Sequence, residues 1–475
     1  MQNHLGEREH IPFKYKLFLG LGNLGKLTIS GTYGSLLTIF YQDYIGLSAR
    51  WIGIASVIYA VWNAVNDPIF GFMTDNTRSK LGRRIPYLRF TSPFLALTFF
   101  LVWMVPESAS GITQFWWMLV IMLLYDTAYT IVGLNSVALL PEIAETDEGR
   151  SSIQIYTGLF GLLAYLFGFL IPEIFRPKVG DDASLLGLRV AMGILGLIGG
   201  GLVFAASYVL KEKPAISQSE KPLGLADSVK ETFKSRSFLI WVVENFMATF
   251  CLSIVTGAIF YLADYVTQTS TIYLLAAIFV PMVLGIVFSK SIVNRFGIAR
   301  TIQLYLLVAG IGLIGIFFLK PNILIYICLG IAGIGFGGTQ ILNDICVGQI
   351  ADEDELRTGR RREGAFFGVN ALVTKPAQSL AIFLTAYTLE ISGFITREQN
   401  LGQIFLDQPG TALLGIRAIV GLIPGVALLI GIIMLIFYPL KGAYLEEVQA
   451  KIQRLHRQKE ENYQAKKLDE QVDLW

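Results

Sequence analysis

The chain has 475 residues, of which 53% are hydrophobic and only 16% are charged, and its mean hydropathy is +0.56. Because an ordinary soluble domain carries about 25% charged residues, this composition argues against a water-soluble globular protein. The formal net charge of +2 gives no sign of a nucleic-acid partner.

Twelve apolar runs follow one another along the chain, each near the ~20 residues that a helix needs to cross a bilayer. Because lipid offers the backbone no hydrogen bonds, these runs should be helical, and their length excludes the short alternating strands of a barrel. The sequence therefore predicts an all-α membrane protein with twelve transmembrane helices in two six-helix bundles. The predicted spans are 18–46, 51–72, 86–106, 112–139, 153–174, 186–210, 238–266, 270–290, 300–319, 321–348, 365–392 and 412–437.

A long polar segment separates the two sets of six spans. We predict an N-terminal bundle at 1–210, a cytoplasmic linker at 211–237, a C-terminal bundle at 238–440 and a cytoplasmic helical tail at 441–475. Most lysines and arginines lie in the termini and in the loops that follow even-numbered spans. This bias places both termini in the cytosol of a multi-pass protein, which we expect in the plasma (inner) membrane.

Both polar segments carry apolar residues at helical spacing. In the linker Leu225, Val229 and Phe233 repeat every four residues, a pattern that suits either an amphipathic helix on the membrane surface or a disordered linker. In the tail Val448 and Ile452 share one face of a predicted helix, whose many charges indicate that it is solvated.

The second span carries a polar stripe at bilayer depth. Asn63, Asn66 and Asp67 fall at i, i+3 and i+4 and so share one face, and Asp67 lies roughly 24 Å along the span. A carboxylate at that depth normally faces a water-filled cavity or a partner charge and marks an ion or substrate path. The alternative is a permanent ion pair that only orients helices.

Two further charges lie near the middle of spans. Lys375 in span 11 precedes Pro376, and its expected partner is Asp67. Asp126 in span 4 shares a helix face with Thr130 and either lines the cavity or holds a neighbouring helix through a hydrogen bond.

Three other charges lie closer to the cytosolic ends of their spans. Lys26 either lines the cavity or extends its ammonium toward the cytosol. For Glu244 and Asp344 we expect a structural role. The glycines of spans 6, 9 and 10 are expected to permit close helix packing.

Other functional classes lack their motifs. There is no GxxxxGK[ST] phosphate loop, so transport driven directly by ATP is disfavoured. No Ser/His/Asp or histidine-metal constellation lies within the spans, so we expect no enzyme. The three cysteines are isolated within spans, so we expect neither a metal site nor a cofactor other than a coupling ion, H⁺ or Na⁺.

At these residues the chain resembles the glycoside–pentoside–hexuronide:cation symporters of the major facilitator superfamily, a family that includes melibiose permease. The similar segments are WNAVNDPIFG, DNTRSKLGRRIPY, LLPEIAETDEGR, ADEDELRTGRRREGAFFG and ALVTK, spread over nearly the whole chain. The resemblance implies a secondary transporter that works by alternating access and couples a cation to a solute.

The resemblance also implies a cation site. The positions that match the family's cation site are Asn63, Asn66, Asp67, Thr130 and Lys375. Because the first aspartate of that site is Asn63 here, one carboxylate that would balance Na⁺ is missing. Proton coupling through Asp67 is therefore expected over sodium coupling, and uncoupled transport stays open.

The implied sugar site departs further from the family. The span-1 aspartate corresponds to Leu27, next to Lys26, and the span-4 aspartate corresponds to Gly133, while Tyr129 is retained. Since paired carboxylates suit sugar hydroxyls, their loss argues against a galactoside bound in that way. Asp126 is the candidate to replace part of this function, so the predicted substrate residues are Lys26, Asp126, Tyr129 and Gly133.

We therefore expect cation-coupled uptake of a sugar or glycoside, with a lysolipid or other amphipathic solute as the alternative. A membrane sensor or assembly protein without transport is the candidate from another class. The expected partners are a small solute and membrane lipid, and we expect a functional monomer. The resemblance further implies a cytoplasmic gate at Asp75, Arg78, Gly82, Arg83 and Arg84.

Overall fold

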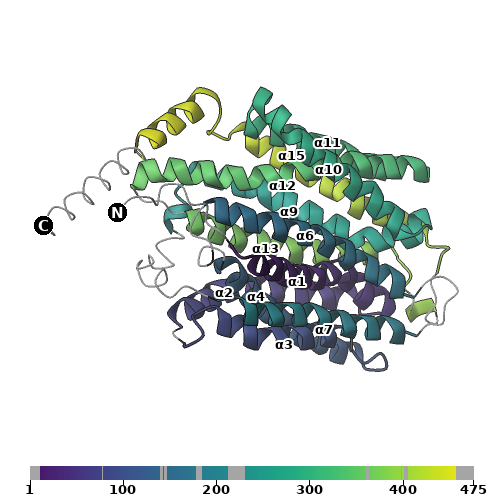
Figure 1. The fold of residues 1–475 in the computed structure, drawn as a ribbon. Helices are drawn as coiled ribbons and strands as arrows, with labels where there is room; N and C mark the ends of the chain where they lie inside the picture. The colour runs from purple at the N-terminus through teal and green to yellow at the C-terminus, as the bar shows by residue number, and fades with distance from the viewer. Residues whose placement is uncertain are drawn as a thin grey trace, which may run out of the picture. The chain divides into compact units, whose positions relative to one another are not determined.

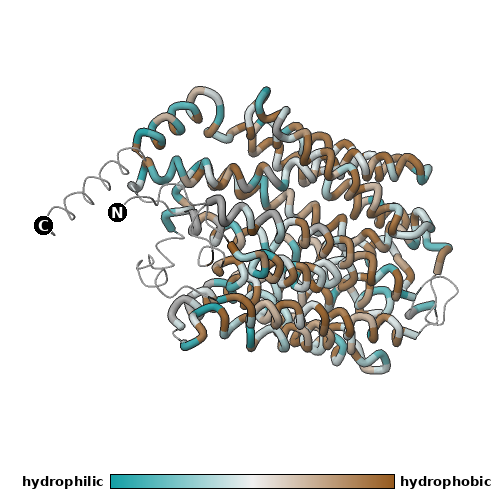
Figure 2. Tube along the Cα trace, viewed as in Figure 1, coloured by the Kyte–Doolittle hydropathy of each residue, from teal (hydrophilic) through white to brown (hydrophobic). Residues whose placement is uncertain are grey.

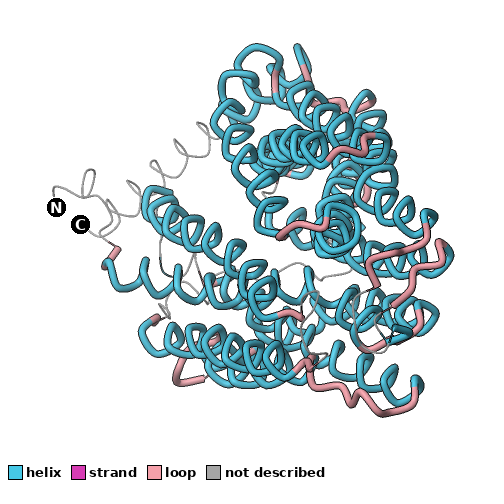
Figure 3. The backbone as a smooth tube through the Cα atoms, turned by 90° about the vertical axis from the view of Figure 1, so that its right-hand side faces the viewer, coloured by secondary structure: helices cyan, strands magenta, loops and turns pink. Residues whose placement is uncertain are grey.

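The computed structural model describes residues 11–77, 79–139, 143, 147–177, 184–211, 230–359, 363–396, 398–400 and 405–455. Within these ranges the chain is helical and has no strand, and short loops join the helices (Figures 1 and 3). Hydrophobic residues dominate the interiors of the long helices, and hydrophilic residues concentrate at their ends (Figure 2). This distribution is typical of membrane-spanning helices.

The first set of helices is α1 (Phe13–Ile39), the π-helical η1 (Phe40–Tyr44), α2 (Ala49–Asn76), α3 (Ile85–Val102), α4 (Gly111–Ala138), α6 (Asp147–Phe175) and α7 (Leu186–Val209). The second set is α9 (Arg236–Tyr261), the π-helical η3 (Leu262–Thr267), α10 (Thr271–Phe296), α11 (Ile298–Phe318), α12 (Asn322–Thr358) and α13 (Glu363–Ile391). It continues with the short η4 (Glu398–Asn400), α14 (Gly410–Arg417), the π-helical η5 (Ala418–Leu422) and α15 (Ile423–Ile436).

Each predicted span coincides with a long helix or a helix continued by a π-helical segment. Nine helical segments of the described chain are long and apolar enough to cross a membrane, and the more polar α1, α2 and α13 cover the remaining predicted spans. The predicted all-α membrane fold is therefore confirmed.

Span 10 differs from its prediction, because its helix continues past residue 348 through an acidic segment. The helix α12 continues to Thr358, and Asp354 pairs with Arg357 one turn later at 2.8 Å, which stabilises the added turns. Gly359 ends the helix with φ of 72° and donates its N–H to the carbonyl of Glu355. Glycine adopts this left-handed conformation without steric cost.

The described helices belong to two compact units. One comprises Met1–Pro222, Ser253–Leu274 and Lys375–Val420, and the other comprises Leu223–Leu252, Leu275–Thr374 and Gly421–Trp475. In the first unit α1 packs against α6 and α7, α3 against α4 and α7, and α2 against α4; in the second, α11 packs against α12 and α15. The predicted division at a 211–237 linker stays a prediction.

Glycines bring helix backbones close together in both units, as predicted for spans 6 and 10. A Cβ on Gly25 of α1 would lie 2.3 Å from the carbonyl oxygen of Gly199 on α7. A Cβ on Gly337 of α12 would lie 2.0 Å from the carbonyl oxygen of Met282 on α10. No side chain fits at either position, so the glycines permit these contacts.

Of the predicted linker at 211–237, residues 212–229 lie outside the described residues. Of the predicted tail, residues 442–455 are helical, and 456–475 lie outside the described residues. Val448 and Ile452 are buried on one face of this helix, as their spacing predicts.

Candidate functional site

An ion pair joins two helices at the centre of the predicted site. Lys375 of α13 donates to the carboxylate of Asp67 on α2, the partner expected from the sequence. The Lys375 side chain is 24% exposed and that of Asp67 is 13% exposed, so the pair is partly open rather than sealed. Lys375 Nζ also donates to Thr130 Oγ1 of α4 at 3.3 Å, so this ammonium group links α13 to two other helices.

A second carboxylate is linked to the ion pair through Thr130. Asn66 Nδ2 donates to Asp126 Oδ2 and, at 3.3 Å, to Thr130 Oγ1. Tyr59 of α2 donates to Asp126 Oδ1 at 3.0 Å. Asp126 is only 3% exposed, and its charge is met by these two neutral donors, which stabilise a buried carboxylate. Thr130 therefore connects the two acids of the site.

Asn63 lies on the same face of α2 and is 2% exposed. Its Oδ1 and the Oδ1 of Asn66 are buried without a hydrogen-bond partner among the described residues. Two buried amide oxygens on the polar face of α2 thus lack a donor. Buried polar groups without a hydrogen-bond partner are rare in native proteins.

Four tyrosines lie near Asp126, and of these only Tyr129 was predicted from the sequence. Tyr33 of α1 stacks on Tyr125 with ring centroids 4.4 Å apart, and Tyr125 stacks on Tyr129 at 6.0 Å. Tyr59 also went unnoticed, although it lies four residues before Asn63 and so shares its helix face. This spacing could have indicated Tyr59 from the sequence. The stack of Tyr33 on Tyr125 joins two helices, so no spacing within one helix predicts it.

The other predicted substrate residues lie apart from the ion pair. Tyr129 is at the end of the tyrosine stack, and a Cβ built on Gly133 would meet no atom within 4 Å. Lys26 of α1 is 9% exposed, and its ammonium group makes no hydrogen bond or ion pair within the described residues. The structure thus brings Asn66, Asp67, Asp126, Thr130 and Lys375 together and leaves Lys26 outside their network.

The predicted cytoplasmic gate is described in part. Arg78 lies outside the described residues, as does the side chain of Asp75. Gly82 has φ of 100° in the turn between α2 and α3, and Arg83 follows it. Arg84 is buried and donates to Thr74 Oγ1 at 2.7 Å, which holds the start of α3 against the end of α2.

A buried ion cluster at the opposite end of the first unit was not predicted. Arg176, just after α6, donates to Glu173 at 2.7 Å, to Asp264 of η3 and, at 3.0 Å, to Thr271. Its side chain is 2% exposed. Glu173 Oε1 accepts from the backbone N–H of Thr271 at 3.3 Å, and the guanidinium lies 4.7 Å from the ring of Phe260.

A related contact joins the two π-helical segments of this unit. Tyr265 of η3 donates to Asp43 Oδ2 of η1 at 2.6 Å, and both are buried. The segments FYQDY (40–44) and FYLADY (260–265) resemble each other, and this internal repeat was the signal that could have revealed the pair. Short π-helical segments occur frequently at functional sites.

The second unit contains a chain of neutral polar side chains. Trp241 donates to Asn343 Oδ1 at 3.1 Å, Asn343 donates to Asn245 Oδ1 at 3.1 Å, and Asn245 donates to Asn370 Oδ1 at 2.9 Å. Glu244, beside this chain, is fully buried. The side chain of Asp344 lies outside the described residues.

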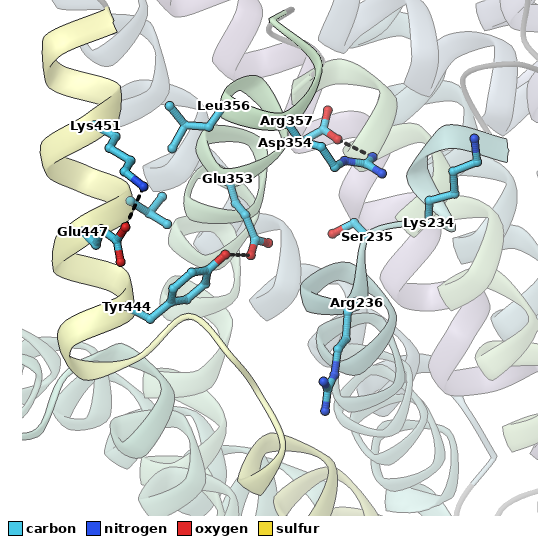
Figure 4. A pocket seen from close by; sticks show the side chains of 11 residues that line it. Lys234, Ser235, Arg236, Glu353, Asp354, Leu356, Arg357, Tyr444, Glu447 and Lys451 are labelled. Carbon is cyan, nitrogen blue, oxygen red and sulfur yellow. Dashed lines mark hydrogen bonds and ion pairs between the residues drawn. The ribbon is translucent and has the colours of Figure 1, made fainter.

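A pocket of about 470 Å³ lies between the end of α12, the start of α9 and the tail helix (Figure 4). Tyr444 donates to Glu353 at 2.8 Å, and this hydrogen bond to a carboxylate raises the pKa of Tyr444. Lys451 binds Glu447 at 2.6 Å and so lowers the pKa of Glu447. The pocket's acids are therefore already paired with donors of the same unit.

Several known proteins that the chain resembles are named as transporters or symporters. The family model described as MFS/sugar transport protein matches residues 18–442. The sodium-dependent lysophosphatidylcholine symporter 1 of Gallus gallus is 23% identical, with 95% of this chain and 91% of that protein covered. The isoprimeverose transporter of Lactiplantibacillus pentosus is 24% identical, with 82% of each chain covered.

Solved structures share the fold. The crystal structure of a D-xylose-proton symporter aligns with a TM-score of 0.62 and 14% identity, covering 90% of this chain and 98% of that one.

Proposed function

The chain belongs to the MFS/sugar transport protein family of multi-pass membrane proteins, and from this premise we propose that it is a secondary active transporter coupling proton movement to the uptake of a sugar or glycoside by alternating access. One observation carries the proposal. The ion pair of Asp67 and Lys375 is partly open and lies next to a second, buried acid. A carboxylate at membrane depth is costly to retain, and its usual reason is an ion or substrate path.

The proposed coupling step is protonation of Asp67. Ionised Asp67 holds Lys375, whose ammonium also binds Thr130. A proton that binds the Asp67 carboxylate removes its charge and releases the ammonium, which keeps its own proton. The stability of the ion pair therefore depends on whether Asp67 is protonated. By linkage, if protonation changes the affinity for the solute by some factor, solute binding changes the affinity for the proton by the same factor.

The residues favour a proton over sodium. Lys375 already supplies a positive charge to the two oxygen ligands that would remain for a metal ion, Asp67 and Thr130. Asn63 adds only a neutral oxygen. Among the described groups that contact Lys375, only Asp67 is an acid. A sodium ion bound there would therefore either displace the ammonium group or share one carboxylate with it.

The solute site is proposed beside Asp126. Its carboxylate is held by Asn66 and Tyr59, and the stack that includes Tyr125 supplies flat apolar faces with polar tips. Few polar groups among aromatic walls are typical of small-molecule sites. A hydroxyl-rich ring with one apolar face fits this chemistry, and a sugar transporter is among the relatives.

The second candidate solute is a lysolipid or similar amphiphile. One support is the open space at Gly133, the position that corresponds to an aspartate in the sugar symporters that the chain resembles. The other is the lysophosphatidylcholine symporter among the relatives. Both candidates use the same protein machinery and differ only in the solute.

Proteoliposomes with a trapped pH dye test the proposal. Sugars, glycosides and lysolipids are added one at a time, and the solute that stabilises the protein against heat should also move protons into the vesicles. Asp67→Asn should abolish solute-driven proton movement, because an amide cannot take up the proton. Glu446→Gln, an exposed carboxylate on the tail helix, is the matched control and should behave as the wild type.

Two results would contradict the proposal. Proton movement unchanged by Asp67→Asn would remove Asp67 from the coupling role. A dependence on sodium at constant pH, with no proton movement in the wild type, would replace the proton as the coupling ion.

A further inference from the structure

An apolar groove lies between the first turns of α2 and the last turns of α13 in the first unit. It has a volume of about 710 Å³, and its walls are mainly aliphatic and aromatic. Val57 of α2 is 59% exposed and Ile391 of α13 is 65% exposed. In a membrane-spanning helix such side chains face lipid.

The groove carries opposite charges at one end. Arg50 is the second residue of α2, and Glu390 is the penultimate residue of α13, and both line the groove. Neither side chain makes an ion pair or hydrogen bond within the described part of the chain, and both residues are exposed. A cation and an anion are thus presented together at the polar end of an apolar channel.

The length of the groove matches one leaflet of a bilayer. From Arg50 to Ile58 the helix axis advances about 12 Å at 1.5 Å per residue. Half of the roughly 30 Å hydrocarbon core is about 15 Å. An acyl chain that lies along this groove therefore places its headgroup at the level of Arg50 and Glu390.

The charge pattern selects the headgroup. An arginine binds a phosphate through two parallel hydrogen bonds, and a carboxylate attracts an ammonium group. A headgroup with a phosphate and an amine satisfies both Arg50 and Glu390. A purely anionic headgroup would instead be repelled by Glu390.

We propose that this groove is a binding site for one zwitterionic membrane phospholipid, with an acyl chain along the apolar walls and its headgroup at Arg50 and Glu390. The site is separate from the solute site and does not depend on the proposed transport function. Its position gives it a consequence for the protein. The same two helices carry Asp67 and Lys375, so a lipid that bridges them also stabilises the contact between them.

Native mass spectrometry of the purified protein in mild detergent tests the site. The protein is titrated with phosphatidylethanolamine or phosphatidylglycerol of equal chain length. We expect one phosphatidylethanolamine to be retained per protein, at least fivefold more than phosphatidylglycerol, and to raise the melting temperature.

Three variants and a control separate this site from general lipid adhesion. Val57→Trp fills the groove and should abolish retention, while Val190→Trp places the same side chain on the exposed face of α7 and should leave it unchanged. Arg50→Gln and Glu390→Gln alter only exposed charges, so they test the lipid preference even if Val57→Trp does not fold. Each should reduce the preference for the zwitterionic lipid.

The inference is overturned if the wild type retains no lipid in a fixed ratio, or retains both lipids equally. It is also overturned if Arg50→Gln and Glu390→Gln keep the wild-type preference. Because no transport is measured, these outcomes leave the proposed transport function standing.

Discussion

The two units handle polar groups inside the membrane in different ways. In the first unit a lysine, three aspartates and an arginine are held in ion pairs and charge-assisted hydrogen bonds. In the second unit the polar chain of Trp241, Asn343, Asn245 and Asn370 consists of neutral donors and acceptors. Glu244, which is buried beside this chain, is ionisable. The four members of the chain itself are neutral, so they can bind helices together but cannot change charge.

This difference assigns separate roles to the units. A charged pair depends on its protonation state and changes its energy by several kcal/mol when a partner is lost. Hydrogen bonds between neutral groups contribute about 1 kcal/mol each and do not respond to protons. We therefore expect function to be sensitive to substitutions in the charged network of the first unit and largely insensitive to those in the neutral chain of the second.

The largest effect is expected from Arg176→Met. Removing the guanidinium leaves Glu173 and Asp264 close together and nearly inaccessible to water, and breaking a buried ion pair typically costs about 3–5 kcal/mol. The variant should melt at a clearly lower temperature in detergent. Arg176→Lys keeps the charge and should recover part of this loss. Equal melting temperatures of Arg176→Met and the wild type would show that the cluster does not stabilise the unit.

Lys375→Met should have the next largest effect, mainly on transport. Because its side chain and that of Asp67 are partly exposed, the loss of stability should be about 1–3 kcal/mol, below that of a sealed pair. Solute-driven proton movement should fall by more than about tenfold. If the double variant with Asp67→Asn is more stable than Lys375→Met alone, the unpaired carboxylate is the source of the loss.

Asp126→Asn should weaken solute binding without unfolding the protein. The amide preserves shape, but the hydrogen bonds from Tyr59 and Asn66 lose their charge, which is worth about 1.5–3 kcal/mol. The solute concentration for half-maximal uptake should rise by about tenfold or more. Tyr59→Phe removes only one donor and should give a smaller shift; wild-type affinity in both variants would place the solute elsewhere.

The sequence predicts the polar stripe of α2 because Asn63, Asn66 and Asp67 follow the helix period within one element. It also predicts Asp67 as the ion-pair partner of Lys375, since few residues of opposite charge lie at that depth. The Arg176 cluster escaped prediction because its residues lie at helix ends, where charges usually belong to solvated loops. Similarly, the end of α12 depends on Asp354 and Arg357, whose pairing no apolar pattern encodes.

A substitution in the second unit tests the contrast directly. Asn343→Leu breaks the link between Trp241 and Asn245 and should cost about 1–2 kcal/mol, because Trp241 keeps a buried donor without an acceptor. Uptake per folded protein should stay within about twofold of the wild type. A loss of proton coupling in this variant would contradict the division of roles.

The smallest effect is expected at the tail. Tyr444→Phe removes the hydrogen bond to Glu353 but leaves the ring in place, and a change at so exposed a position usually alters stability by less than about 0.5 kcal/mol. Phenylalanine has no ionisable group, and uptake should not change. Val448→Asp is the sharper counterpart, because it places a charge on the buried face of the same helix and should detach the helix from the end of α12. Protease sensitivity of the tail measures this, and equal cleavage of both variants would show that the buried face does not hold the helix.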